Sequence, residues 1–137
     1  MRVCLDTNTL LQIFGRTQPF RPIKDAMARG RIELAVSTAI LLEYEETITR
    51  LSGRTRWQEV EQFLIAAFQL HANILFIDPQ FRFHLISSDP DDNKFVDCAI
   101  AAQADYIITS DHDFDVLLGK GYKPKPITPD QFVAAHC

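Results

Sequence analysis

The sequence predicts an α/β protein whose mostly parallel sheet of about four to five short strands is flanked by helices. Short apolar stretches rich in branched residues alternate along the chain with longer segments of helical periodicity. Three of these stretches are followed directly by an acidic residue. Open parallel sheets bind their ligands at the carboxyl ends of strands. The length of 137 residues fits a single domain, which we expect to span residues 1–137.

Five short apolar stretches are predicted strands, the last of them an edge strand because it contains Pro126 and is flanked by prolines. They cover residues 2–5, 32–36, 74–77, 106–110 and 125–128. Capping residues and apolar periodicity predict the helices between and after them. The first begins near Thr7, and the others cover residues 23–29, 38–51, 57–71, 93–104, 114–118 and 129–137. A basic turn is expected over residues 52–56, so the helices on either side of it form a hairpin that is a candidate dimer surface.

The composition excludes several classes of protein. The hydrophobic fraction of 47% supports a packed core, but no apolar stretch reaches the roughly 18 residues of a membrane-spanning helix. The start, MRVCLDTN, lacks the apolar region of a signal peptide, and the three cysteines contain no CxxC pair. We therefore expect a reduced, cytoplasmic protein without a structural zinc site, in which Cys4 and Cys98 are core residues. The net charge of −4 argues against a basic nucleic-acid coat protein.

Negative charge is concentrated between Asp89 and Asp115. This stretch holds eight of the 18 acidic residues and a single base, Lys94. Two carboxylates about 4 Å apart repel by about 4 kcal/mol at an effective dielectric constant near 20. Such a cluster is therefore expected where a cation binds, or where the acids are spread over solvated loops.

The helix predicted over residues 93–104 is apolar around nearly its whole circumference, which is typical of a buried helix. Asp97 is the exception within it. Burying an ionised carboxylate without a partner costs several kcal/mol. Asp97 is therefore neutral, paired with a base, or bound to a metal ion.

Three further acids are predicted near the same edge of the sheet. Asp6 and Asp111 each follow a strand, and Glu43 lies in the first turns of the helix after the second strand. Taken alone, Asp6 is equally explained as a helix N-cap and Glu43 as a solvated or paired surface residue. Together with Asp97 they offer the oxygen ligands that Mg²⁺ or Mn²⁺ prefers. Such ions activate water and neutralise charge in phosphodiester hydrolysis.

Other chemistries fit the acidic stretch less well. An EF-hand loop starting at Asp89 fails, because Lys94 and Ile100 stand where glycine and glutamate are required. The sequence contains no phosphate-binding loop, no GxGxxG pattern and no nucleophile elbow. A receiver-type signalling domain phosphorylated on Asp78 is an alternative, but Asp6 is single where that domain has an acidic pair.

Three segments in order, VCLDTNTLL, STAILLEYEE and DPDDNKFVDCAIAAQADYIITSDHDF, resemble the PIN-domain ribonucleases. More narrowly they resemble the VapC-like toxins of prokaryotic toxin–antitoxin pairs. The most specific parts are the Asp-Thr-Asn start and the Thr-x-Asp-x-Asp-Phe segment over residues 109–114. The resemblance implies a three-layer PIN-like fold, an RNA substrate, Mg²⁺ or Mn²⁺ as cofactor, homodimerisation through the helical hairpin, and inhibition by a small antitoxin protein.

The resemblance also implies roles for particular residues. Its metal-holding and catalytic set is Asp6, Glu43, Asp97 and Asp111. Its supporting residues are Asn8 and Thr109, with Asp113 as an outer member and Asp92 where some members carry a further acid. Whether Asp92 or Asp97 lies nearer the metal stays open. Four arginines outside the site are candidates for contact with RNA phosphates: Arg16, Arg50, Arg54 and Arg56.

Two functional hypotheses follow from these residues. The first is a Mg²⁺- or Mn²⁺-dependent endoribonuclease that is the toxin of a toxin–antitoxin pair. The alternative is a non-catalytic PIN-like protein that binds RNA or an antitoxin. The complete set of acids favours the first hypothesis.

Overall fold

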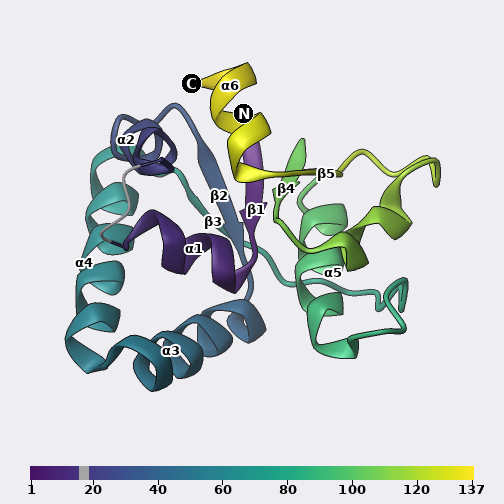
Figure 1. The fold of residues 1–137 in the computed structure, drawn as a ribbon, viewed down its shortest axis with the longest axis horizontal. Coiled ribbons are helices and arrows are strands. Elements are labelled where there is room, and N and C mark those ends of the chain that lie inside the picture. The colour runs from purple at the N-terminus through teal and green to yellow at the C-terminus, as the bar shows by residue number, and fades with distance from the viewer. Residues whose placement is uncertain (16–18) are drawn as a thin grey trace.

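The computed structural model describes residues 1–15 and 19–137, which form one parallel sheet with helices on both sides (Figure 1). The strands are β1 (Arg2–Leu5), β2 (Glu33–Val36), β3 (Ile74–Phe76), β4 (Tyr106–Ile108) and β5 (Lys125–Ile127). Their order is β3-β2-β1-β4-β5, and all neighbouring pairs within the described residues are parallel. The predicted α/β class with a mostly parallel sheet is confirmed.

The helices make the outer layers. They are α1 (Thr7–Ile13), α2 (Arg21–Ala28), α3 (Thr38–Ser52), α4 (Arg54–His71), α5 (Asn93–Ala101) and α6 (Pro129–His136), with short 3₁₀ helices η1 (Pro90–Asp92) and η2 (His112–Leu117). Figure 1 shows α1 to α4 on one side of the sheet and α5 on the other, so the sheet is the middle of three layers. None of the helices in the described part of the chain is long and apolar enough to cross a membrane.

The strand order reverses between β1 and β4, and the place where the carboxyl ends of these two strands meet is the β1–β4 crevice of the fold. From β1 the chain adds β2 and β3 on one side, and then crosses to add β4 and β5 on the other. Neighbouring crossovers therefore leave in opposite directions at the carboxyl ends of β1 and β4. This reversal is where open parallel sheets bind ligands.

The α3–α4 hairpin is tighter than the sequence predicts. The prediction of a five-residue basic turn over residues 52–56 is wrong, because Gly53 alone separates the two helices. Gly53 adopts φ +91°, a conformation that other residues rarely take, so one residue reverses the chain. Arg54 and Arg56 therefore lie in the first turn of α4 and not in a loop.

Helix α5 is buried, as its composition predicts. Phe95, Val96, Cys98 and Ala99 are all within the core, and Cys98 and Cys4 are free buried thiols as expected. The segment after β3 has no regular secondary structure up to η1. Side chains of α5 hold this segment instead: Asn93 bonds both backbone groups of Ile86, at 2.9 and 2.8 Å.

Candidate metal centre

Asp6 lies directly after β1 and serves two purposes. Its Oδ1 accepts a 2.9 Å hydrogen bond from the backbone N–H of Thr9, which makes it the N-cap of α1. Its Oδ2 accepts a hydrogen bond from the Thr109 hydroxyl. Asp6 is only 7% exposed, and this burial raises the pKa of its carboxyl above the ordinary value despite the hydrogen bonds from Thr109 and Thr9. The N-cap interpretation is therefore correct, and it leaves the carboxylate at the β1–β4 crevice.

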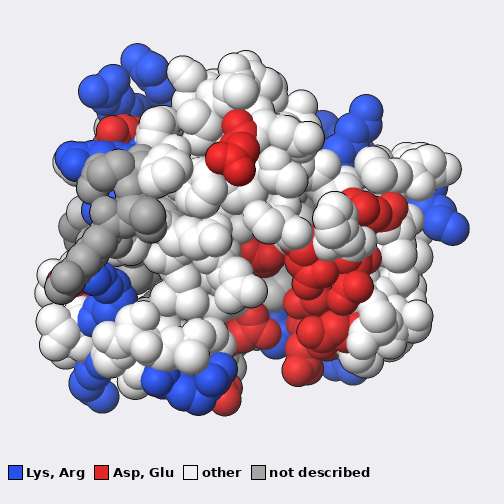
Figure 2. All heavy atoms as spheres, viewed as in Figure 1, with Lys and Arg blue, Asp and Glu red and all other residues white. Residues whose placement is uncertain are grey.

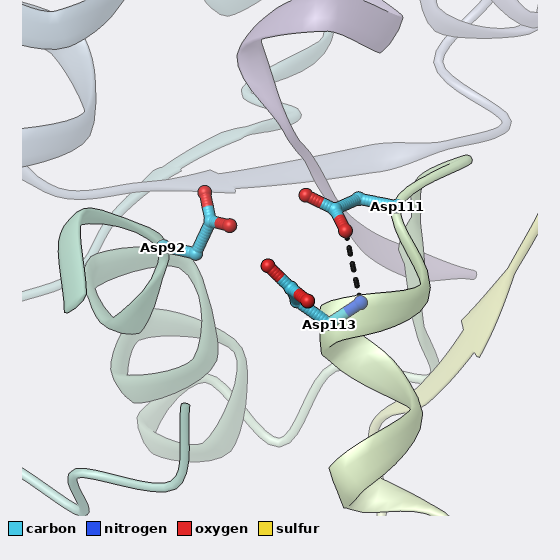
Figure 3. Close-up of side chains that lie close together, drawn as sticks. All are labelled: Asp92, Asp111 and Asp113. Atoms are coloured by element: carbon cyan, nitrogen blue, oxygen red, sulfur yellow. Dashed lines mark hydrogen bonds between the residues drawn. The ribbon is translucent and has the colours of Figure 1, made fainter. Parts of the chain in front are cut away.

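The end of β4 brings two more carboxylates to the crevice. The Thr109 hydroxyl that donates to Asp6 also accepts from the backbone N–H of Asp111, at 3.0 Å. Asp111 in turn caps η2, since its Oδ1 accepts from the N–H of Asp113 at 2.9 Å (Figure 3). Thr109 thus links the two strand ends to each other through one hydroxyl.

Glu43 reaches the same edge from α3. The hydroxyl of the following residue, Tyr44, donates a 2.5 Å hydrogen bond to the carbonyl of Leu5 and so fixes α3 against the end of β1. Glu43 Oε2 accepts from the Thr7 hydroxyl, and its Oε1 lies 2.7 Å from Lys94 Nζ. Glu43 is thus already held by a cation and a hydroxyl, both beside the crevice.

Asp92 completes a cluster of carboxylates. It is the last residue of η1, and it points toward Asp111 and Asp113 (Figure 3). One oxygen from each of these three side chains lies within 4.8 Å of the others. Two oxygen ligands on opposite sides of a Mg²⁺ ion are about 4.2 Å apart, so the spacing of the cluster fits a divalent cation.

The Oδ2 atom of Asp92 is buried and has no hydrogen-bond partner among the described residues. Burial first, and then the negative charges of Asp89, Asp111, Asp6 and Glu43, raise the pKa of Asp92 to about 7. A buried acceptor without a partner is costly, and a cation at the cluster is the group that would satisfy it. The donor set of carboxylate oxygens suits Mg²⁺ or Mn²⁺.

The structure does not bring Asp97 to this cluster. The Asp97 side chain is 8% exposed and its Oδ1 accepts a 3.0 Å hydrogen bond from the backbone N–H of Phe83. Asp97 follows Asp92 by five residues, and a helix turns by about 140° over that separation. The carboxylates of Asp92, at the end of η1, and of Asp97, in α5, therefore point in different directions, and it is Asp92 that joins the cluster. The sequence predicts only a supporting role for Asp92. The feature of the sequence that could have pointed to it is the Asp-Pro cap before η1.

The remaining predicted residues are Asn8 and the four arginines. Asn8 is exposed in the first turn of α1. Arg50 and Arg54 are exposed, whereas Arg56 bonds the carbonyl of Phe14 at 2.7 Å and pairs with Glu59 at 2.9 Å. Arg16 lies outside the described residues. On the face that Figure 2 shows, acidic atoms gather beside α5, while basic atoms lie in separate groups at the α3–α4 turn, near α2 and at the right-hand edge.

The fold and the cluster define a class: an α/β protein with an acidic site at the carboxyl edge of a parallel sheet. Within that class the chain belongs to the PIN domain family, whose sequence model matches residues 2–113. The matched region contains the whole carboxylate cluster and Asp6, Glu43 and Thr109.

The fold is similar to that of a solved structure, described as VapBC2 from Rickettsia felis bound to a DNA fragment from their promoter. The superposition has a TM-score of 0.63 and covers 93% of this chain and 98% of the other, at 14% sequence identity. This likeness supports the fold. A search of curated proteins found no match.

Proposed function

We propose that the protein is a divalent-metal-dependent endoribonuclease that hydrolyses RNA phosphodiester bonds. The observation that supports this most is the partnerless, buried Oδ2 of Asp92 within a cluster of three carboxylates at the β1–β4 crevice. Asp92, Asp111 and Asp113 would hold Mg²⁺ or Mn²⁺, with Asp6 beside them. Membership of the PIN domain family supports the nuclease assignment.

A bound Mg²⁺ or Mn²⁺ ion supplies charge neutralisation at the phosphate and activation of water. The side chains of the protein orient the site. Thr109 holds Asp6 and the backbone of Asp111 through one hydroxyl, so the two strand ends keep a fixed separation. Lys94, paired with Glu43 at 2.7 Å, places a positive charge next to the crevice where a phosphate would approach.

RNA cleavage tests the proposal directly. The purified full-length chain is expected to cut labelled single-stranded RNA with Mg²⁺ or Mn²⁺ and to lose this activity with EDTA. Asp111→Asn and Asp92→Asn should each lower the rate at least a hundredfold. Asp130→Asn, which removes the same charge from the exposed first turn of α6, is the matched control. Metal-independent cleavage that persists in both site variants would contradict the assignment.

Calorimetric titration with Mn²⁺ separates the two candidate ligands and the two functional hypotheses. Asp92→Asn should abolish Mn²⁺ binding, whereas Asp97→Asn should retain it because Asp97 bonds Phe83. The opposite result would restore Asp97 to the ligand set. Absence of binding to the native chain at millimolar Mn²⁺ would favour a non-catalytic, binding PIN-like protein.

We also propose that the protein is the cytoplasmic toxin of a toxin–antitoxin pair and forms a homodimer. The similar fold of a VapBC2 complex supports an antitoxin partner.

The α3–α4 hairpin exposes large apolar side chains that suit a dimer interface: Leu42, Leu51, Ile65, Phe68 and Leu70. Light scattering of the purified chain should give twice its mass of 15.6 kDa, and Leu42→Glu should restore the monomer. A monomeric native chain at high concentration would refute the dimer.

A further inference from the structure

A cavity of about 600 Å³ lies beside η1, next to the carboxylate cluster. The turn from η1 into α5 forms a shared wall, because Asp91, Asn93 and Lys94 line the cavity while Asp92 points to the cluster. The opposite wall is the start of α3 and the segment after β3. A strand bound at the cluster therefore has this cavity as its neighbour.

Asp97 lines this cavity. Its Oδ1 accepts the N–H of Phe83, and its side chain is otherwise buried in α5. A carboxylate can accept about four hydrogen bonds, so Asp97 keeps acceptor capacity for a ligand in the cavity. The burial of Asp97, which first suggested a metal ligand, is compatible with recognition of a hydrogen-bond donor.

The walls of the cavity carry aromatic rings that the protein leaves open. Phe76 and Phe81 both line it, and they are 64% and 74% exposed. Exposed phenylalanines beside a polar cavity are surfaces on which unpaired nucleobases stack. Arg82 lines the same cavity and is exposed, which provides positive charge for a nucleic-acid backbone.

We propose that this cavity binds an unpaired base of the RNA strand held at the carboxylate cluster, and that Asp97 selects guanine. The proposal rests on the proposed ribonuclease function. Guanine presents two adjacent N–H donors on its Watson–Crick edge, which match a carboxylate acceptor. Adenine and cytosine offer only an amino group there, and uracil a single ring N–H.

Nucleotide binding tests the cavity without any need for cleavage. Guanosine 5′-monophosphate contains no internucleotide bond, so its affinity for the full-length protein is independent of nuclease activity. We expect it to bind about tenfold more tightly than the adenosine, cytidine and uridine monophosphates. Equal affinities for the four nucleotides, or no binding at millimolar concentration, would overturn the proposal.

Two variants test the residues. Asp97→Asn keeps an acceptor oxygen for Phe83 and turns an amide donor toward the cavity, so the preference for guanosine monophosphate should disappear. Phe81→Ala should weaken all four nucleotides about tenfold through lost stacking. Leu118→Ala is its control, since Leu118 is 56% exposed and does not line the cavity. If Asp97→Asn does not fold, the exposed Phe81 keeps the proposal testable. Unchanged selectivity in a folded Asp97→Asn would refute it.

Sequencing the ends of RNA fragments separates this inference from the nuclease assignment. Metal-dependent cleavage without any preference for a neighbouring guanine would refute the base cavity alone. Selective binding of guanosine monophosphate by a protein that cuts no RNA would support the cavity and refute the nuclease.

Discussion

Replacing Asp92 with asparagine should stabilise the metal-free protein at neutral pH and remove the stabilisation that a cation gives. Burial and the neighbouring carboxylates raise the pKa of Asp92 from 3.8 to about 7. The folded protein therefore holds a proton that the unfolded chain releases, so stability falls as the pH rises from about 4 to about 7.

The size of the effect follows from the pKa shift. A rise from 3.8 to about 7 corresponds to about 4 kcal/mol at neutral pH. Because the side chain is partly exposed, solvent screening reduces the expected gain from Asp92→Asn to about 1–2 kcal/mol. The gain should be absent near pH 4, grow toward pH 7 and stay constant above it.

Urea unfolding in the presence of EDTA measures this gain in the free energy of unfolding. The fluorescence of the single tryptophan, Trp57, which is buried, monitors the unfolding. Added Mn²⁺ should reverse the order of stability. At a hundredfold excess over its dissociation constant it stabilises the native chain by about 2.7 kcal/mol, and the variant lacks a ligand. Asp91→Asn, the exposed neighbour on η1, is the control and should show neither effect. An Asp92→Asn protein that is less stable than the native chain without metal at pH 8 would refute the reasoning.

Two further substitutions test the supporting structure. Thr109→Val removes the hydroxyl that bonds Asp6 while keeping the shape, so it should cost about 1–3 kcal/mol in urea unfolding and weaken Mn²⁺ binding in calorimetry; unchanged stability would show that this hydroxyl is dispensable. Gly30→Ala should be more destabilising than Gly53→Ala by about 1–3 kcal/mol. Both glycines have positive φ, but a Cβ at Gly30 lies 2.9 Å from His71, whereas Gly53 faces open space. Equal melting temperatures of the two variants would contradict this.

The sequence alone was sufficient for the class of fold and for most of the residues at the crevice. Local patterns of apolar and capping residues predict strands and helices without knowledge of distant contacts. Asp6 and Asp111 could be placed because both follow strands, and parallel strands end at one edge. The same local patterns misjudged the α3–α4 turn, where a single glycine with positive φ does what a longer loop was expected to do.

Whether Asp92 or Asp97 joins the carboxylate cluster was decided only by tertiary structure. The sequence leaves open which of the two lies nearer the metal, although a lone carboxylate in an apolar helix, such as Asp97, requires a partner. In the folded chain that partner is the backbone N–H of Phe83, contributed by a segment without regular structure that no periodicity could predict. Asp92 is left facing Asp111 and Asp113 with one buried oxygen unsatisfied. The sequence determines which residues are acidic. The direction of each carboxylate depends on how η1 and α5 are rotated against the sheet and on what packs beside them.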